Sequence, residues 1–329
     1  MTTRLFQKRP GQYLETNRAK AAFEDIYRRS TPHAYFSEMR RLGYQIGEQA
    51  RPYCIAAAQL IARAAPAWPV QMLDVGCSYG VGSAFVRYGC SFEELVSFFD
   101  SRAPTGYHEC TAATRTWLNV VAPALDMRVV GLDASGNAIR FGLDAGLLDA
   151  GISRDLECED PSGHEQAWLA GCNLLICTGA IGYVGRATFD RILAHLGTNH
   201  PGGCGSMAVM TVLRMFDPCE VGQAFEAAGY AFEHVGDVRL PQRGFADESE
   251  QQNVLTKVRA RGLDTRDVEE RGVLYADLYI AGVPELQPRL RAAMDDVRRK
   301  APIFSRQVQV AHACASARNG ASRLAFCRS

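Results

Sequence analysis

The sequence predicts an α/β protein built on a mostly parallel, seven-stranded sheet with helices on both faces. Three observations predict this fold. Short apolar runs alternate with helical segments along most of the 329 residues, as in strand–helix–strand units. The first two of these runs each end in an aspartate, and a glycine-rich turn follows the first. Hydrophobic residues make up 47% of the chain, which is enough to form a large core.

The first part of the chain, residues 1–65, is predicted to be an N-terminal helical section. Pro32 and Pro52 are expected to divide it into three helices, because proline disrupts a helix interior. Aromatic residues such as Tyr35 and Tyr44 gather in this section, and we expect it to form a lid over a substrate. Ordinary packing between helices is an equally good interpretation of the same residues.

Seven strands are predicted in the remainder of the chain. The predicted strands are 70–75, 127–133, a short run ending near 156–160, 172–177, 207–213, 232–239 and 274–281. With the helices between them they would form an α/β core over 66–284. A C-terminal helix and a tail are expected over 285–329.

The segment between the first two strands is unusually long. It is about twice as long as a simple strand–helix–strand unit of roughly 30 residues would need. The excess, residues 90–124, has helical character over 92–99 and 111–121. We therefore predict a helical insertion here, and a surface elaboration, a substrate cover and an oligomer contact all remain open as its role.

The most informative motif follows the first strand, where Leu73-Asp74-Val75 leads into Gly76-Cys77-Ser78-Tyr79-Gly80-Val81-Gly82. Glycines let the backbone adopt sharp turns and approach a ligand closely. A helix is predicted directly after the turn, and its free N–H groups would face the same place. The glycine order is G-x-x-x-G-x-G, whereas the dinucleotide fingerprint is G-x-G-x-x-G.

This glycine order resembles the S-adenosylmethionine loop of class I (Rossmann-like) methyltransferases, and the resemblance extends over residues 72–281. It implies that the methionine end of the cofactor is held by five residues of the loop, namely Asp74, Gly76, Cys77, Gly80 and Gly82. A structural tight turn without a ligand is the alternative.

The second strand ends in Gly131-Leu132-Asp133-Ala134. The resemblance implies that Asp133, with Ala134 beside it, binds the two ribose hydroxyls of the cofactor. A helix cap is the alternative role of Asp133. Further along, the resemblance implies an acid near the adenine amino group, for which Asp160 is the first choice and Glu159 the second. An exposed acidic loop explains these two residues equally well.

The fourth predicted strand runs into Thr178-Gly179-Ala180-Ile181. By resemblance, Thr178 and Gly179 lie in the cofactor-binding loop beside the transferring methyl. Methyltransferases that act on nucleobases and on protein glutamine often carry Asn/Asp-Pro-Pro-Tyr at this place. The departure from that motif argues against such substrates and favours a small molecule.

A general base is needed only if the nucleophile arrives protonated. Candidate catalytic residues near the expected mouth of the site are Tyr183, His108 and His33. Tyr35 and Tyr183 are also candidates for binding the substrate. Single histidines are more often surface or capping residues than bases.

Together these features imply methyl transfer from S-adenosylmethionine to a small-molecule acceptor, by in-line displacement at the sulfonium methyl and with S-adenosylhomocysteine as product. Two alternatives remain open. One is a non-catalytic S-adenosylmethionine binder, and the other is an NAD(P)-dependent oxidoreductase.

The composition of the chain limits the classes of partner that we expect it to bind. The 36 basic and 36 acidic residues cancel, so no overall field favours nucleic acid or an anionic membrane. The 11 cysteines are scattered, with neither zinc spacing nor a disulfide framework, so no metal is predicted. No signal-peptide pattern is found, and we expect a cytoplasmic protein. The sequence leaves a homodimer open.

Overall fold

The computed structural model describes residues 25–66, 68–101, 106–197 and 205–300. The first part of the expected lid, residues 1–24, and the expected tail, residues 301–329, lie outside the described residues.

The described chain folds around one mixed sheet of seven strands in the order β3-β2-β1-β4-β5-β7-β6. Only β7 runs against the others, pairing antiparallel with both β5 and β6. The strands are β1 Val70–Val75, β2 Met127–Asp133, β3 Ala150–Ser153, β4 Leu174–Thr178, β5 Met207–Leu213, β6 Ala231–Gly244 and β7 Val273–Gly282. This topology confirms the prediction of a mostly parallel seven-stranded sheet.

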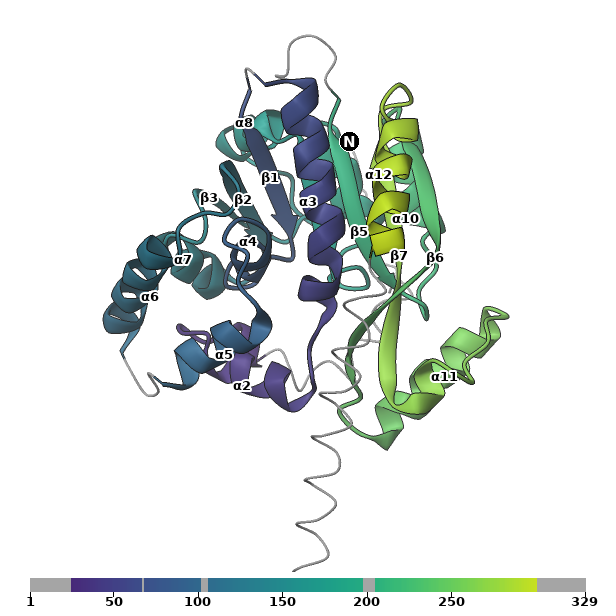
Figure 1. Ribbon diagram of the computed structural model, residues 1–329, viewed down its shortest axis with the longest axis horizontal. Helices are drawn as coiled ribbons and strands as arrows, with labels where there is room; N and C mark the ends of the chain where they lie inside the picture. Colours follow the sequence, from purple (N-terminus) through teal and green to yellow (C-terminus); the bar gives the residue numbers. More distant parts are fainter. Residues whose placement is uncertain (1–24, 67, 102–105, 198–204, 301–329) are drawn as a thin grey trace, which may run out of the picture.

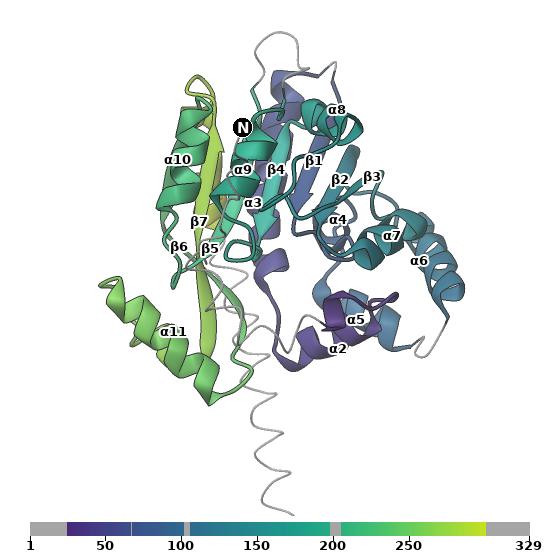
Figure 2. The same cartoon turned by 180° about the vertical axis from the view of Figure 1, so that it is seen from behind.

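Helices cover both faces of this sheet, as predicted. Helices α3, α4 and α12 lie over one face, and α9 and α10 lie over the other (Figures 1 and 2). The helices are α2 His33–Arg41, α3 Ile46–Ala64, α4 Val81–Val86, α5 Phe92–Asp100, α6 Tyr107–Val121, α7 Gly136–Ala145, α8 Gly163–Gly171, α9 Arg186–Leu193, α10 Cys219–Ala227, α11 Glu248–Ala260 and α12 Gln287–Lys300, with a short 3₁₀ turn at Glu269–Arg271.

The predicted insertion between β1 and β2 is helical and consists of α5 and α6. Ser91 caps α5 by accepting a hydrogen bond from the Glu94 N–H, while the Glu94 side chain reaches back to the Ser91 N–H. The Phe99 ring of α5 stacks on the Phe36 ring of α2 at 4.7 Å between centroids. Helix α5 of the insertion therefore supports α2. Helices α2 and α5 both lie beyond the carboxyl ends of the strands (Figure 1).

The prediction that Pro52 separates two helices is wrong, because Pro52 lies inside α3. A proline in a helix interior removes one backbone hydrogen bond and costs about 3 kcal/mol. Alternate turns of α3 bury residues against the sheet, among them Ala50, Cys54 and Ala57. This burial holds the helix together across the proline. Pro32, by contrast, does mark a boundary, at the start of α2.

The third strand was predicted too late in the sequence. The structure has β3 at Ala150–Ser153, paired with β2, and residues 156–158 form a turn. The Asp155 carboxylate accepts a hydrogen bond from the Glu157 N–H, which favours a turn over a continuing strand.

The sixth strand is longer than the predicted 232–239 and continues to Gly244. A break in register between His234 and Arg239 and the proline at 241 obscured this continuation in the sequence. The register break and the proline are tolerated because β6 is an edge strand. It pairs with β7 on one side only, so a missing N–H on its other side costs no hydrogen bond between strands. The extension carries Gln242 and Arg243, which line the cavity described below.

Candidate functional site

A cavity of about 460 Å³ opens at the carboxyl edge of the sheet. The loops after β1, β2 and β3 line one side, the ends of β5 and β6 with the start of β7 line the other, and the loop after β4 lies between them. The first side, which we call the polar half, includes Gly76, Ser78, Asp133, Ala134, Ser135, Asp155 and Leu156, together with Arg28 and Arg154. The second, the aromatic half, consists of Tyr27, Tyr35, Met39, Tyr44, Tyr183, Leu213, Met215, Gln242, Arg243, Glu250 and Leu274. Ligands of open parallel sheets bind at this edge.

At two positions of the first loop glycine is required, because a Cβ atom there would clash with a neighbouring residue. Gly76 has a φ of +73°, and a Cβ placed there would lie 2.3 Å from the Cβ of Ala180. A Cβ on Gly82 would lie 2.3 Å from Oδ2 of Asp74. The glycines therefore let the β1 loop touch the β4 loop on one side and the Asp74 carboxylate on the other.

Asp74 is a buried carboxylate that is only partly satisfied. It is 2% exposed, and its Oδ2 has no hydrogen-bond partner among the described residues. Burial, with a smaller contribution from the charge of Asp133, raises the pKa of Asp74 to about 7, although the Gly82 N–H works in the opposite direction. Burial raises the pKa of Tyr35, a residue of the cavity wall, and the charge of Asp74 adds a small further contribution. A buried acceptor of this kind favours a cationic or hydrogen-bond-donating ligand nearby.

Asp133 ties the first two loops together. Its Oδ2 accepts a hydrogen bond from the Ser78 N–H at 2.9 Å, and its Oδ1 accepts one from the Ser135 N–H at 2.8 Å. Each carboxylate oxygen has a second lone pair, so the group can still accept hydrogen bonds from a ligand in the cavity. Burial raises the pKa of Asp133, while these two N–H groups lower it.

The β4 loop forms the floor between the two halves. Thr178, Gly179 and Ala180 all line the cavity, and Gly179 has a φ of +83°. The Gly179 N–H donates to the Thr211 hydroxyl at 3.0 Å. A Cβ on Gly179 would lie 3.3 Å from Nε2 of Gln242, so the Gln242 amide packs directly against this loop.

An ion pair closes the far end of the aromatic half. The Arg243 guanidinium donates to both carboxylate oxygens of Glu250, at 2.9 and 2.7 Å, and the Ala246 N–H donates to the same carboxylate at 2.7 Å. Burial works to raise the pKa of Glu250, but the hydrogen bonds and charge of Arg243 outweigh it and hold that pKa below its usual value. Glu250 therefore stays ionised and fully engaged.

A short segment, residues 25–29, crosses the polar half; we call it the N-terminal strap. Its carbonyls accept hydrogen bonds from side chains of the β1 and β2 loops. Tyr79 Oη lies 2.9 Å from the Ile26 carbonyl and 2.8 Å from the Arg29 carbonyl. The Ser135 hydroxyl donates to the Tyr27 carbonyl and the Asn137 amide to the Arg28 carbonyl, both at 2.7 Å. The strap thereby places Tyr27 in the cavity wall.

Of the residues singled out from the sequence, seven line the cavity: Gly76, Asp133, Ala134, Thr178, Gly179, Tyr35 and Tyr183. Asp74, Cys77, Gly80 and Gly82 do not reach the wall but form the packed turn behind it. The Cys77 thiol is buried and bonds the Ser78 carbonyl. Gly80, in the left-handed region at φ +86°, begins α4.

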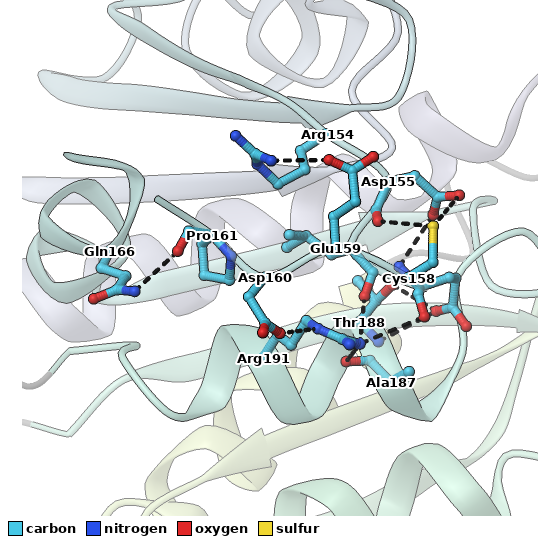
Figure 3. Close-up of polar contacts among 12 residues, drawn as sticks. Arg154, Asp155, Cys158, Glu159, Asp160, Pro161, Gln166, Ala187, Thr188 and Arg191 are labelled. Atoms are coloured by element: carbon cyan, nitrogen blue, oxygen red, sulfur yellow. Dashed lines mark hydrogen bonds and ion pairs between the residues drawn. The ribbon is translucent and has the colours of Figure 1, made fainter. Parts of the chain in front are cut away.

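Three candidates lie away from the cavity. Asp160 forms an ion pair with Arg191, drawn in Figure 3. The two groups lie 2.6 Å apart, and the Asp160 side chain is 84% exposed. The β3 loop instead reaches the cavity through Asp155 and Leu156. His33 contacts the Thr31 hydroxyl at 3.1 Å and packs edge-on against Phe99, and burial lowers its pKa. His108 is exposed beside the Tyr107 ring. Neither histidine lines the cavity, so neither is placed to act as a base there.

Sequence reasoning missed several residues of the cavity. Ser78 and Ser135 lie inside motifs that were identified, and the positive φ of 49° at Ser78 follows from the sharp turn there. Gln242, Arg243 and Glu250 carried no signal, because they are brought to the cavity by an extended edge strand and the helix after it. Tyr27 and Tyr44, by contrast, belong to the aromatic-rich N-terminal section that was expected to form the lid, and both line the cavity.

Two features of the described chain concern metals and membranes. In residues 25–300, apart from the undescribed gaps, no three His, Cys, Asp or Glu side chains cluster as metal ligands would. Over the same residues, every helix is too short or too polar to cross a lipid bilayer.

Comparison with known proteins gives fold-level similarity. No protein-family model matches the chain, and no curated protein is similar to it. Among solved structures, it is similar to the magnesium protoporphyrin IX methyltransferase ChlM of Synechocystis PCC 6803 with bound S-adenosylhomocysteine, at 10% identity and a TM-score of 0.38, over 80% of this chain and 99% of that one. The plantazolicin methyltransferase BamL, at 12% identity and 0.37, is matched over 81% and 96%. The amino pentose methyltransferase CalS10 of Micromonospora echinaspora, at 16% and 0.32, is matched over 72% and 93%. These likenesses concern the fold alone.

Proposed function

We propose that the protein transfers a methyl group from S-adenosylmethionine to a small-molecule acceptor and releases S-adenosylhomocysteine. The observation that carries this proposal is that the G-x-x-x-G-x-G turn, with the partly unsatisfied Asp74 packed behind it, and the ribose candidate Asp133 meet at one end of the cavity. A merely structural turn would have no use for a buried carboxylate oxygen without a partner.

The residues of the polar half suit the cofactor by their chemistry. Asp74 is a buried carboxylate whose pKa burial raises to about 7, and an ammonium at the methionine end would favour its ionised form. Asp133 retains acceptor capacity for two ribose hydroxyls beyond its two backbone bonds. The wall near Asp155 and Leu156 lies one strand further along the sheet, where an adenine ring would follow the ribose.

The cofactor supplies an electrophilic methyl group on a sulfonium, and the protein supplies alignment and a partly dry enclosure. Alignment of reacting groups alone accounts for roughly 7–11 kcal/mol of barrier lowering in well-oriented reactions. The tyrosine rings of the aromatic half offer faces that attract a cation. Gly179 of the β4 loop lies where the polar and aromatic halves meet, so ligands bound in the two halves would be close together there.

We assign the lid function expected of residues 1–65 to the N-terminal strap and α2, which contribute Tyr27, Tyr35 and Met39 to the wall. Helix α3 packs on β1, β4, β5 and β6 and so belongs to the core layer. Residues 66–284 serve as the cofactor-binding core in this proposal. Helix α12, which follows it, packs against α3 and β7.

Ligand binding and turnover test the proposal together. S-adenosylhomocysteine is expected to raise the thermal midpoint of the protein, since a ligand that binds only the folded state stabilises it, and NADH is expected to leave the midpoint unchanged. Labelled S-adenosylmethionine should then transfer label to a member of a small-molecule panel. Stabilisation by NADH alone would favour the oxidoreductase, and binding without any transfer would favour a non-catalytic binder.

A further inference from the structure

We infer that Glu157 is a positioning residue, which joins the part of the cavity wall that receives the cofactor to the β4 loop that carries Tyr183. This inference rests on the proposed function, because it takes the polar half as the cofactor site and the aromatic half as the acceptor site. Glu157 itself lies behind the cavity wall, where the β3 loop meets the start of α9.

The start of α9 is capped from another loop. Its N-cap residue is Gly185, and no side chain of its own caps the helix. Instead, Glu157 Oε1 accepts hydrogen bonds from the Gly185 N–H at 2.7 Å, from the Thr188 N–H at 3.2 Å and from the Thr188 hydroxyl. The first N–H groups of a helix have no partner within the helix, and the helix dipole favours a negative charge beside them. The Glu157 carboxylate therefore ties the β3 loop to α9.

Helix α9 also holds the β3 loop through Arg191. The Arg191 Nη1 donates to the Leu156 carbonyl at 2.9 Å, and its Nε donates to the Asp160 carboxylate at 2.6 Å. Figure 3 shows Arg191 and Thr188 on the same stretch of α9, facing the β3 loop. A carboxylate of the loop thus binds the helix and a guanidinium of the helix binds the loop. These contacts in both directions fix Leu156 and Thr188, which both line the cavity, relative to each other.

Glu157 is also bonded to a residue of the cofactor side. The Asp155 Oδ1 accepts a hydrogen bond from the Glu157 N–H at 3.0 Å, and Asp155 lines the polar half. In the proposed function this wall meets the adenine end of the cofactor. A ligand that orders Asp155 would therefore also order the turn from which the Glu157 side chain reaches α9.

On the acceptor side, the β4 loop is a compact turn that ends at the Glu157 contact. The N–H groups of Tyr183 and Val184 both donate to the Ala180 carbonyl, at 2.9 and 3.2 Å. Tyr183 and Val184 line the cavity directly before Gly185. The position of Tyr183 in the wall therefore depends on where Glu157 holds Gly185.

These contacts form a continuous path from Asp155 through Glu157 and Gly185 to Tyr183. Cofactor binding is expected to order the β4 loop through this path and so to prepare the aromatic half for the acceptor. Two binding sites coupled in this way raise each other's affinity by the same factor, commonly about 5- to 150-fold.

Hydrogen exchange with and without S-adenosylhomocysteine tests the inference and needs no acceptor. In the parent protein, the ligand should slow exchange at the amides of Tyr183, Gly185 and Thr188 by at least about fivefold. In Glu157→Ala this response should be lost. Glu157→Gln keeps an oxygen that can accept the same hydrogen bonds but lacks the charge, so it should keep part of the response.

Two controls show whether the effect is specific to the β4 loop. The Ser78 and Ser135 amides donate to Asp133, and the ligand should still protect them in Glu157→Ala. Glu94→Ala removes a carboxylate from the start of another helix, α5, away from the cavity wall. This variant should keep the response of the β4 loop to the ligand.

A double variant separates positioning from helix capping, since Glu157→Ala removes both. Adding Gly185→Ser to Glu157→Ala supplies a cap from the N-cap position itself, where the extended backbone at φ −132° suits serine. The double variant should recover the thermal midpoint lost in Glu157→Ala. It should not recover the response of the β4 loop, because the contact with the β3 loop is still missing.

The outcomes distinguish this inference from the proposed function. A β4-loop response that persists in Glu157→Ala, that returns in the double variant, or that is absent from a parent protein that binds S-adenosylhomocysteine would overturn the role of Glu157. Failure of the parent protein to bind S-adenosylhomocysteine would instead overturn the proposed function.

Discussion

The two halves of the cavity are built in different ways. The polar half comes from loops that directly follow β1, β2 and β3, and its key contacts use backbone groups, such as the N–H groups of Ser78 and Ser135 on Asp133. The aromatic half gathers side chains from the N-terminal strap to the start of β7. Backbone geometry encoded by a short motif forms the first half, whereas the second depends on long-range packing of side chains.

This difference indicates which substitutions each half of the cavity is expected to tolerate. The polar half depends on glycines and on one carboxylate that joins two loops, so it has few alternatives. The aromatic half rests on the buried Arg243–Glu250 pair and on rings whose identity the fold does not require. Five variants test whether the halves can be disturbed separately, beginning with the largest expected effect.

Breaking the ion pair should have the largest effect, and on stability. Glu250→Ala leaves the Arg243 charge buried without its partner, which is expected to lower the free energy of unfolding by about 3–5 kcal/mol. Chemical denaturation measures this change. Glu248→Ala, an exposed position on the same helix, should change stability by less than about 0.5 kcal/mol.

A compensating pair sharpens the same experiment. Replacing both partners, Arg243→Met with Glu250→Leu, should recover most of the lost stability, since no unpaired charge remains. The affinity for S-adenosylhomocysteine should stay close to that of the parent in this double variant. A large loss of that affinity would show that the two halves are not separable.

Removing the ribose candidate should affect the polar half alone. Asp133→Ala is expected to weaken S-adenosylhomocysteine binding by about 1.5–3 kcal/mol, typical of hydrogen bonds to a charged group. Calorimetry on the folded variant gives the value. Asp160→Ala is the comparison, because Asp160 is exposed and paired with Arg191, and it should leave the affinity unchanged. Equal losses of affinity in Asp133→Ala and Asp160→Ala would indicate that Asp160 contacts the adenine end of the cofactor after all.

The buried Asp74 predicts a pH dependence of stability. Its pKa is raised from 3.8 to about 7 by burial, so between these values the folded state binds more protons than the unfolded state. Its contribution to stability is full below pH 3.8 and is lost as the pH rises through about 7. From pH 5 to pH 8, the unliganded protein should therefore lose about 2 kcal/mol relative to Asp74→Asn.

The ligand gives a direct check on this interpretation of Asp74. A bound ammonium near the carboxylate would favour its ionised form and flatten the difference between the parent and Asp74→Asn. Denaturation curves of the parent and of Asp74→Asn, recorded across this pH range with and without S-adenosylhomocysteine, measure this difference. The same pH dependence with and without ligand would contradict an ammonium contact at Asp74.

The smallest expected effect concerns the N-terminal strap. Tyr79→Phe removes the hydroxyl that contacts the carbonyls of Ile26 and Arg29, at a cost of about 1 kcal/mol. Hydrogen exchange should accelerate over residues 25–29, and S-adenosylhomocysteine should dissociate faster. Tyr88→Phe removes a hydroxyl bond to the Gly146 carbonyl elsewhere and should leave both unchanged. Unaltered exchange in Tyr79→Phe would show that Tyr79 does not hold the strap closed.

The comparison of halves also explains where sequence reasoning succeeded. The turn after β1 and the end of β2 were identified because each encodes its own geometry in consecutive residues, as Gly76 and Gly82 do by their close contacts. The errors lie where local preference and tertiary packing disagree. Pro52 is held within α3 by burial, and the break in β6 near Asp237 is held by pairing with β7.

The sequence by itself therefore determined the sheet, the helices that cover it and the position of the polar half, because apolar periodicity and glycine spacing act over a few residues. Tyr35 and Tyr183 of the aromatic half were candidates from the sequence, but only the tertiary structure decided which other residues complete that half. Tyr27, Gln242 and Glu250 meet there because the strap, an extended edge strand and α11 converge at one edge of the sheet. That convergence depends on contacts between residues distant in the chain, which no local pattern records.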